Sequence, residues 1–144
     1  MKLSEILKNL TASLISGNED TEISGVATDS KKVQKGDLFI CYCGKSHDSH
    51  DDIAEITKKG AAAVICEKKL DTDLPQILAQ DGRAQIARAA RAFYGFPDKK
   101  LKIVGVTGTN GKTTTTYMLD SIFKFNGNKT GKIGTLGISY DGKF

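Results

Sequence analysis

Apolar residues follow a helical or a strand pattern along most of this chain. The spacing of Leu3, Ile6, Leu7 and Leu10 predicts a short amphipathic helix over residues 3–10. Residues 53–59 predict a second helix, which Gly60 ends as a C′ residue. Asp81 is a good N-cap for a third helix, which Gly95 and Pro97 stop. We expect this third helix to bury one face, made of Ile86, Ala89, Ala90, Phe93 and Tyr94.

Short apolar runs predict the strands of this part of the chain. The expected strands are residues 23–27, 38–43, 61–66 and, as a short edge strand, 75–79. The order strand, loop, helix, strand indicates a small α/β unit with a partly parallel, mixed sheet. Residues 96–100 are polar and contain a proline, so we place a domain junction near residue 98.

Residues 101–125 show a different arrangement. A β-branched apolar run over 101–106 predicts a strand, and glycine and asparagine then break the pattern. A helix follows, whose one face is expected to carry Met118, Leu119, Ile122 and Phe123. After a turn at 126–128, residues 129–134 predict a strand, and Asp141-Gly142 is typical of a hairpin turn.

Strand, glycine-bearing turn and helix, in this order, are the context of a phosphate-binding P-loop. Gly108 and Gly111 allow consecutive amides to point at one anion, and the helix N-terminus adds positive potential. Lys112 is predicted to be catalytic by reaching the β and γ phosphates, Thr113 to ligate Mg²⁺, and Thr114 to contact the α and β phosphates. The residues predicted to bind the nucleotide are Gly108, Thr109, Asn110, Gly111, Lys112, Thr113 and Thr114. The loop is shorter than the usual G-x4-G-K-[ST] pattern.

Composition and charge exclude several other functions. The net charge of +4 is mild and the lysines are scattered, so we expect no nucleic-acid partner. No apolar run reaches membrane-spanning length and no signal peptide begins the chain, so we expect a cytoplasmic protein. We also expect a monomer. His47 and His50, on either side of Asp48, are expected to be surface groups rather than metal ligands.

The motif TGTNGKTTTT at residues 107–116 resembles the ATP loop of the Mur ligases, and folylpolyglutamate synthetases carry a related loop. Residues 28–40, TDSKKVQKGDLFI, resemble the signature of the uridine-nucleotide-binding domain of MurE and MurF types. Asn110, together with the segment 133–137, is closer to the MurE type. The resemblance extends from about residue 23 onward.

This resemblance implies a fold and a substrate site. Residues 1–98 would form a mixed-sheet α/β domain that binds UDP-N-acetylmuramoyl substrate, and 99–144 the first strand–P-loop–helix–strand of an incomplete ATPase domain. The substrate-binding residues would be Thr28, Ser30, Lys45, Ser46 and His47. Asp29 is expected to brace its own turn. The family's Asp-Gly-His is Asp48-Ser49-His50 here, so serine replaces a turn glycine.

The implied reaction is the formation of an amide bond. ATP and Mg²⁺ would activate the carboxylate of UDP-N-acetylmuramoyl-L-alanyl-D-glutamate as an acyl phosphate, which the amine of a diamino acid attacks. The residues do not decide between diaminopimelate and lysine, and we expect this chain, as an N-terminal part, to be inactive alone. The alternatives are a MurF-type ligase, a folylpolyglutamate synthetase, or a uridine-nucleotide-binding module without catalysis.

Overall fold

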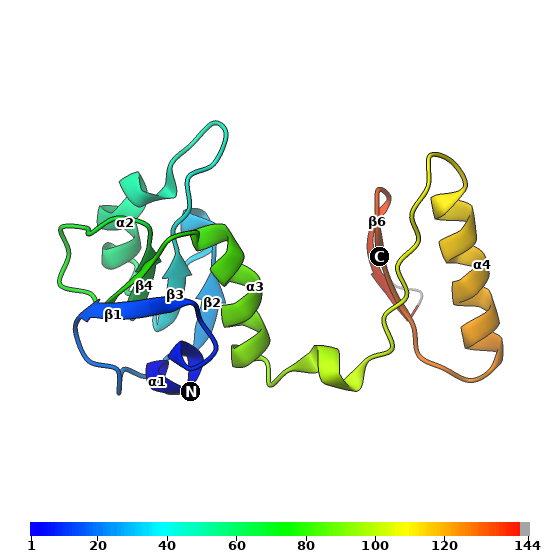
Figure 1. The fold of residues 1–144 in the computed structure, drawn as a ribbon, viewed down its shortest axis with the longest axis horizontal. Helices are drawn as coiled ribbons and strands as arrows, with labels where there is room; N and C mark the ends of the chain where they lie inside the picture. Colours follow the sequence, from blue (N-terminus) through cyan, green and yellow to red (C-terminus); the bar gives the residue numbers. More distant parts are fainter. Residues whose placement is uncertain (142–144) are drawn as a thin grey trace. The chain divides into compact units, whose positions relative to one another are not determined.

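The computed structural model describes residues 1–141 and contains two compact units, which divide after Leu101 (Figure 1). The junction predicted near residue 98 falls in the 3-10 helix η3 (Pro97–Lys100), just before this division. The predicted Asp141-Gly142 turn lies partly outside the described residues. The two units are described separately below.

The first unit contains a five-stranded mixed sheet with the strand order β1-β5-β4-β3-β2. Strands β2 to β5 run parallel to one another, and β1 is antiparallel to β5. The bounds are β1 (Ala12–Ser16), β2 (Gly25–Ala27), β3 (Asp37–Ile40), β4 (Ala63–Cys66) and β5 (Gln76–Ala79). The mixed α/β fold is confirmed. The prediction that β5 is an edge strand was wrong, because β1, which the sequence analysis missed, covers its outer side.

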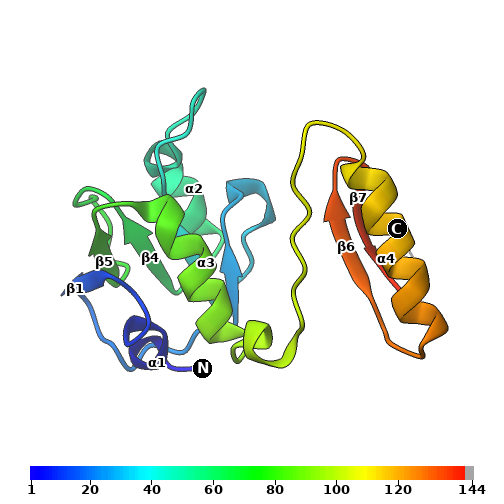
Figure 2. The same cartoon turned by 45° about the vertical axis from the view of Figure 1, so that its right-hand side comes forward.

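Helices cover both faces of this sheet. Helices α1 (Leu3–Leu7) and α3 (Gly82–Phe93) share one apolar core with Leu38, Ile40 and Ile65. On the other face, α2 (Ile53–Lys58) places Ile56 against Phe39, Cys41 and Val64. Figure 2 shows α3 in front of the sheet. Because β3 and β4 are buried on both faces, the runs 38–40 and 63–66 are continuously apolar rather than alternating.

Helix α3 begins as predicted but buries a different set of residues. The Asp81 carboxylate accepts a hydrogen bond from the Ala84 N–H at 2.9 Å, which confirms the N-cap. Ala89 and Ala92 are buried, whereas Tyr94 is 66% exposed, so its predicted burial was wrong. Tyr94 lies at the C-cap, where the chain leaves the helical path before the positive φ of Gly95.

The second unit consists of α4 (Lys112–Phe125) and an antiparallel hairpin of β6 (Gly131–Gly134) and β7 (Gly137–Tyr140). The predicted strand over 101–106 does not form, because no other strand among the described residues pairs with this segment. Residues 101–105 are exposed, with Ile103 at 76%.

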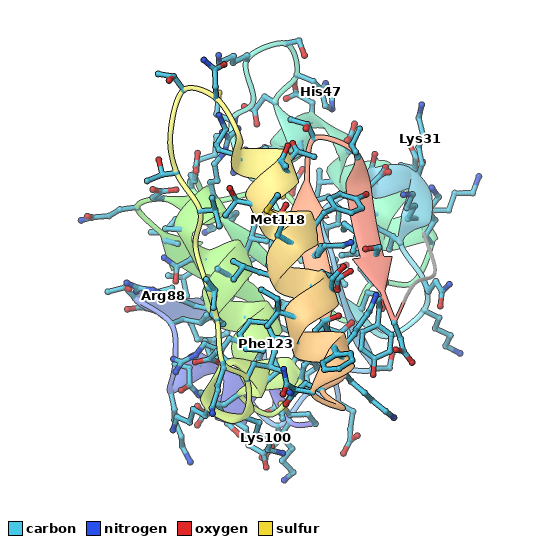
Figure 3. All side chains as sticks on the ribbon, turned by 90° about the vertical axis from the view of Figure 1, so that its right-hand side faces the viewer. Lys31, His47, Arg88, Lys100, Met118 and Phe123 are labelled. Atoms are coloured by element: carbon cyan, nitrogen blue, oxygen red, sulfur yellow. The ribbon has the colours of Figure 1, made fainter. Side chains whose placement is uncertain are left out.

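The apolar face predicted for α4 is also solvent-exposed over much of its area. Met118 and Ile122 are 61% and 56% exposed. Figure 3 labels Met118 and Phe123 on this helix. The buried residue of the helix is instead Asp120, which bonds Lys132 at 2.8 Å, Lys124 at 3.0 Å and the Thr130 hydroxyl. These partners hold the pKa of Asp120 well below its usual range, since Lys132, Thr130 and Lys124 all favour the ionised carboxylate.

Candidate functional sites

The first unit contains a cavity of about 540 Å³ where its parallel strands end. Three segments form its walls: residues 28–30 after β2, residues 42–52 after β3, and Arg83 at the start of α3. Ligands of α/β proteins commonly bind at the carboxyl ends of parallel strands. The lining residues are Thr28, Asp29, Ser30, Tyr42, Gly44, Lys45, Ser46, His47, Ser49, Asp52 and Arg83. The structure thus brings together the predicted substrate residues Thr28, Ser30, Lys45, Ser46 and His47, whose contact with substrate stays a prediction.

The segment after β2 is held from two sides. Asp29 caps the 3-10 helix η1 (Ser30–Lys32), and its carboxylate accepts a hydrogen bond from the Lys31 N–H at 3.0 Å. Asp29 therefore braces its own turn, as predicted. The Lys59 ammonium donates to the Ser30 carbonyl at 2.7 Å and to Glu55 at 2.6 Å. These contacts fix the backbone of Ser30 at the pocket.

Ser49 closes the loop that follows β3. Its hydroxyl accepts from the Tyr42 N–H at 2.9 Å and donates to the Tyr42 carbonyl at 3.0 Å. Ser49 has no positive φ, so this position does not require the glycine that the family pattern has there. The serine thus replaces glycine without strain and ties Tyr42 to the pocket wall.

His50 anchors the same loop to the end of β4, and its predicted surface position was wrong. Its side chain is 3% exposed. Nε2 accepts from the Glu67 N–H at 2.9 Å, so the proton is on Nδ1, which donates to Asp48 at 2.5 Å. Lys68 bonds the other Asp48 oxygen at 3.0 Å. The hydrogen bonds from His50 and Lys68 hold the pKa of Asp48 well below its usual range.

The charges around the pocket favour an anion. His47, on the loop after β3 (Figure 3), pairs with Asp52 at 3.0 Å. This hydrogen bond raises the pKa of His47 and lowers that of Asp52. Among residues 1–141, Lys45 and Arg83 form no ion pair, whereas the pocket carboxylates lie near other basic side chains, Asp29 at 3.9 Å from the Lys32 ammonium and Asp52 at the His47 imidazole. The pocket therefore has two basic side chains free to meet a phosphate.

Sequence reasoning missed Tyr42, Asp52 and Arg83 as pocket residues. Arg83 is far from the other two along the chain and joins them only because β5 runs parallel to β3 and β4. The signal available in the sequence was topological: a helix that starts after a parallel strand begins at the same edge as the neighbouring loops.

The second unit contains the predicted phosphate loop before α4. Gly108 and Gly111 have φ values of +149° and +78°, a conformation that side chains other than glycine rarely adopt. Gly111 is also the N-cap of α4, and no side chain caps the first-turn amides. The Lys112 ammonium folds back and donates to the carbonyls of Gly108 at 2.5 Å and Thr109 at 3.2 Å.

This donor set fits a phosphate group with a bound magnesium ion. Uncapped helix amides and an exposed ammonium bind phosphate oxygens, and the Thr113 hydroxyl is a hard ligand for Mg²⁺. Thr113 also lines a cavity of about 30 Å³ between α4 and the hairpin. Thr109, Asn110 and Thr114 are exposed. The roles of these residues remain predictions.

No helix within residues 1–141 is long and apolar enough to cross a lipid bilayer.

Solved structures with a similar fold define the class of protein. The chain aligns with a UDP-N-acetylmuramoyl-L-alanyl-D-glutamate–2,6-diaminopimelate ligase with a TM-score of 0.75 and 23% identity, covering 97% of this chain and 28% of that one. MurF from Acinetobacter baumannii aligns with a TM-score of 0.72 and 26% identity, covering 86% and 27%. The MurF ligase from Thermotoga maritima in complex with ADP aligns with a TM-score of 0.58 and 34% identity, covering 73% of this chain and 24% of that one. The fold is thus that of ligases with these names.

The family is shown by sequence. Residues 22–94 match the profile of the Mur ligase family, catalytic domain, and residues 106–143 match the Mur ligase middle domain. The chain belongs to the Mur ligase family. Relatives include the UDP-N-acetylmuramoyl-L-alanyl-D-glutamate–2,6-diaminopimelate ligases of Bacillus velezensis, 43% identical over 96% of this chain, and Syntrophomonas wolfei, 46% identical over 94%. The chain spans about 28% of the length of each.

Proposed function

We propose that this chain provides the nucleotide-substrate pocket and the phosphate loop of an ATP-dependent ligase. The ligase would join a diamino acid to UDP-N-acetylmuramoyl-L-alanyl-D-glutamate in peptidoglycan precursor synthesis. The names of the relatives support this reaction and favour 2,6-diaminopimelate as the added residue. The observation that carries the proposal is the pocket of the first unit, which gathers the predicted substrate residues from separate segments.

In this pocket we assign the short hydroxyl side chains to hydrogen bonds with the uridine nucleotide. Thr28, Ser30 and Ser46 present such groups from two segments. Lys45 supplies positive charge for the diphosphate, and His47 adds a further charge when it is protonated. Residues 1–98 are thereby proposed as the substrate-binding domain, and residues 99–144 as the start of the ATP-binding one.

The phosphate loop is assigned to ATP, as the ADP complex of the Thermotoga MurF supports. When bound, ATP supplies the phosphoryl group that activates the substrate carboxylate. Lys112 would hold the β and γ phosphates, Thr113 would ligate Mg²⁺, and the amides of the loop from Gly108 to Thr114 would position the phosphate chain. We assign no residue among 1–141 as a general base for this reaction. We further propose a cytoplasmic monomer without a nucleic-acid partner.

A second candidate is a MurF-type ligase, because MurF structures are among those with the same fold. A folylpolyglutamate synthetase would carry a related loop, and a uridine-nucleotide-binding module would use the first unit alone. The substrate separates these possibilities. The first proposal requires the UDP-linked dipeptide, MurF requires the longer UDP-linked peptide, and a folate enzyme binds neither.

The test is calorimetric titration of the chain with UDP-N-acetylmuramoyl-L-alanyl-D-glutamate. We expect saturable binding that Ser30→Ala weakens by roughly five-fold, the equivalent of about 1 kcal/mol for one hydrogen bond. Ser13→Ala, on the exposed side of β1, is the matched control and should bind like the parent chain. Absence of binding by the parent chain would contradict the substrate-pocket assignment, and an unchanged Ser30→Ala affinity would remove Ser30 from it.

A further inference from the structure

Arg83 has an unusual position among the basic residues of the first unit. It lines the pocket, and its guanidinium carbon lies 5.1 Å from the centre of the Tyr42 ring. Within the described part of the chain, Arg83 forms no ion pair and no side-chain hydrogen bond, in contrast to Arg91, which bonds Asp98 at 2.7 Å. The N–H groups of the Arg83 guanidinium are therefore available to bind a ligand.

The backbone on both sides of this stacked pair is fixed. A β-carbon on Gly82 would lie 2.0 Å from the Cys41 carbonyl oxygen, so the start of α3 touches the end of β3. The Gly82 N–H donates to the Glu67 carboxylate at 2.8 Å. Since Arg83 follows Gly82 and Tyr42 follows Cys41, this contact sets the two side chains beside each other. Tyr42 is in turn held by its two hydrogen bonds with Ser49.

A guanidinium in this state is suited to a phosphate. Its planar fork offers parallel N–H donors that match two phosphate oxygens, and stacking on the ring leaves this edge uncovered. The Arg83 side chain is exposed, and its contact with the Tyr42 ring reduces the number of conformations that it has to lose on binding. Lys45, the other unpaired cation of the pocket, is a flexible point charge without such support.

We propose that Arg83, stacked on Tyr42, binds the diphosphate of the nucleotide substrate. This inference rests on the proposed function, in which the pocket takes a UDP-linked substrate. It assigns the start of α3 to the diphosphate subsite, and it leaves the hydroxyl side chains of the loops after β2 and β3 for the nucleoside.

The experiment compares UDP with uridine as ligands of the full 144-residue chain, titrated by NMR chemical-shift changes. Arg83→Gln removes the charge and the fork, and should weaken UDP binding by roughly 10- to 100-fold, while uridine binding changes by less than about two-fold. Arg83→Lys keeps the charge and should recover only part of the loss. Arg88→Gln is the matched control, because Arg88 is exposed on the same helix and does not line the pocket (Figure 3). It should bind both ligands like the parent chain.

Each other result has a distinct meaning. If Arg83→Gln weakens uridine as strongly as UDP, Arg83 shapes the pocket rather than binding phosphate, and the inference is overturned. It is also overturned if UDP binding is unchanged, or if Arg88→Gln loses as much affinity. If the parent chain binds neither ligand, the uridine-nucleotide pocket of the proposed function fails, and this inference fails with it. Unchanged thermal unfolding of the variants shows that they remain folded.

Discussion

Gly82 packs directly against Cys41, so that a β-carbon on Gly82 would stand 2.0 Å from the Cys41 carbonyl oxygen. This contact joins α3 to β3 at the pocket. Gly82→Ala must push the helix away from the strand, and we expect it to destabilise the first unit by about 1–3 kcal/mol, as overpacking does. Urea unfolding measures the effect. Gly105→Ala is the control, since a β-carbon there meets nothing within 4 Å. Equal stability of the two variants would contradict the close contact.

Mutation of the two histidines in the loop after β3 should change the stability by different amounts. His50→Ala removes the bonds to Asp48 and Glu67 from a buried site, and we expect a loss of about 2 kcal/mol in the free energy of unfolding. His47→Ala is the matched control, because His47 is largely exposed and should lose little stability. Thermal unfolding of both variants checks this. A larger loss for His47→Ala than for His50→Ala would be incompatible with the structure.

The affinity of the pocket for its substrate should fall as the pH rises. Asp52 raises the pKa of His47, so the His47 charge is fully present below the ordinary histidine value of about 6.5 and is lost only above it. We expect the affinity for UDP-N-acetylmuramoyl-dipeptide to decrease by at most about five-fold through the raised pKa. Titrations between about pH 5.5 and 8.5 measure this. His47→Gln should remove most of this dependence of affinity on pH. If the variant depends on pH as the parent chain does, His47 is not the group responsible.

Lys112 should affect nucleotide binding without affecting the fold. Its hydrogen bonds in the structure go to carbonyls of its own loop, and the residue is exposed. We therefore expect Lys112→Met to weaken the binding of ADP with magnesium by at least roughly ten-fold, as for a lost bond to a charged group. NMR titration measures the affinity, with Lys129→Met as an exposed control in the same unit. Parent-like affinity in Lys112→Met would refute the loop assignment.

Asp120 should determine the stability of the second unit. Asp120→Asn keeps the shape but removes the charge that faces Lys124 and Lys132, and we expect a loss of about 1–2 kcal/mol. Because its pKa is lowered, this contribution is present above about pH 4 and disappears as the pH falls through the folded-state pKa. Hydrogen exchange of the β6 and β7 amides measures it. Asp141→Asn, at an exposed site, is the control; protection lost equally in both variants would exclude the Asp120 contacts as the cause.

The sequence was informative wherever a segment is buried on both sides. The apolar runs of β3 and β4 revealed a central sheet, and Gly60 and Asp81 revealed helix ends. Strand β1 was missed because it is an edge strand, whose residues alternate between half-buried and exposed. Residues 101–106 were predicted as a strand from the same kind of apolar run, but a strand also needs a paired neighbour, which a local pattern does not show.

The candidate site was predictable in part for a related reason. Thr28, Ser30, Lys45, Ser46 and His47 lie in loops next to a recognisable motif, and the structure gathers them around one pocket. Arg83 and Tyr42 have no motif, and their meeting depends on the contact between Gly82 and Cys41. His50 looked like a surface residue because its partners, the Asp48 carboxylate and the Glu67 amide, come together only in the folded loop.

Because the pocket spans the ends of three strands, a ligand bound in it stabilises the whole sheet. A ligand that touches the segments after β2 and β3 and the start of α3 can bind only when β2, β3 and β5 are in register. At a free concentration of 100 times its Kd, such a ligand adds about 2.7 kcal/mol to the free energy of unfolding. Strand β2 is three residues long and lies at the edge of the sheet, so ligand binding should protect it most against local unfolding.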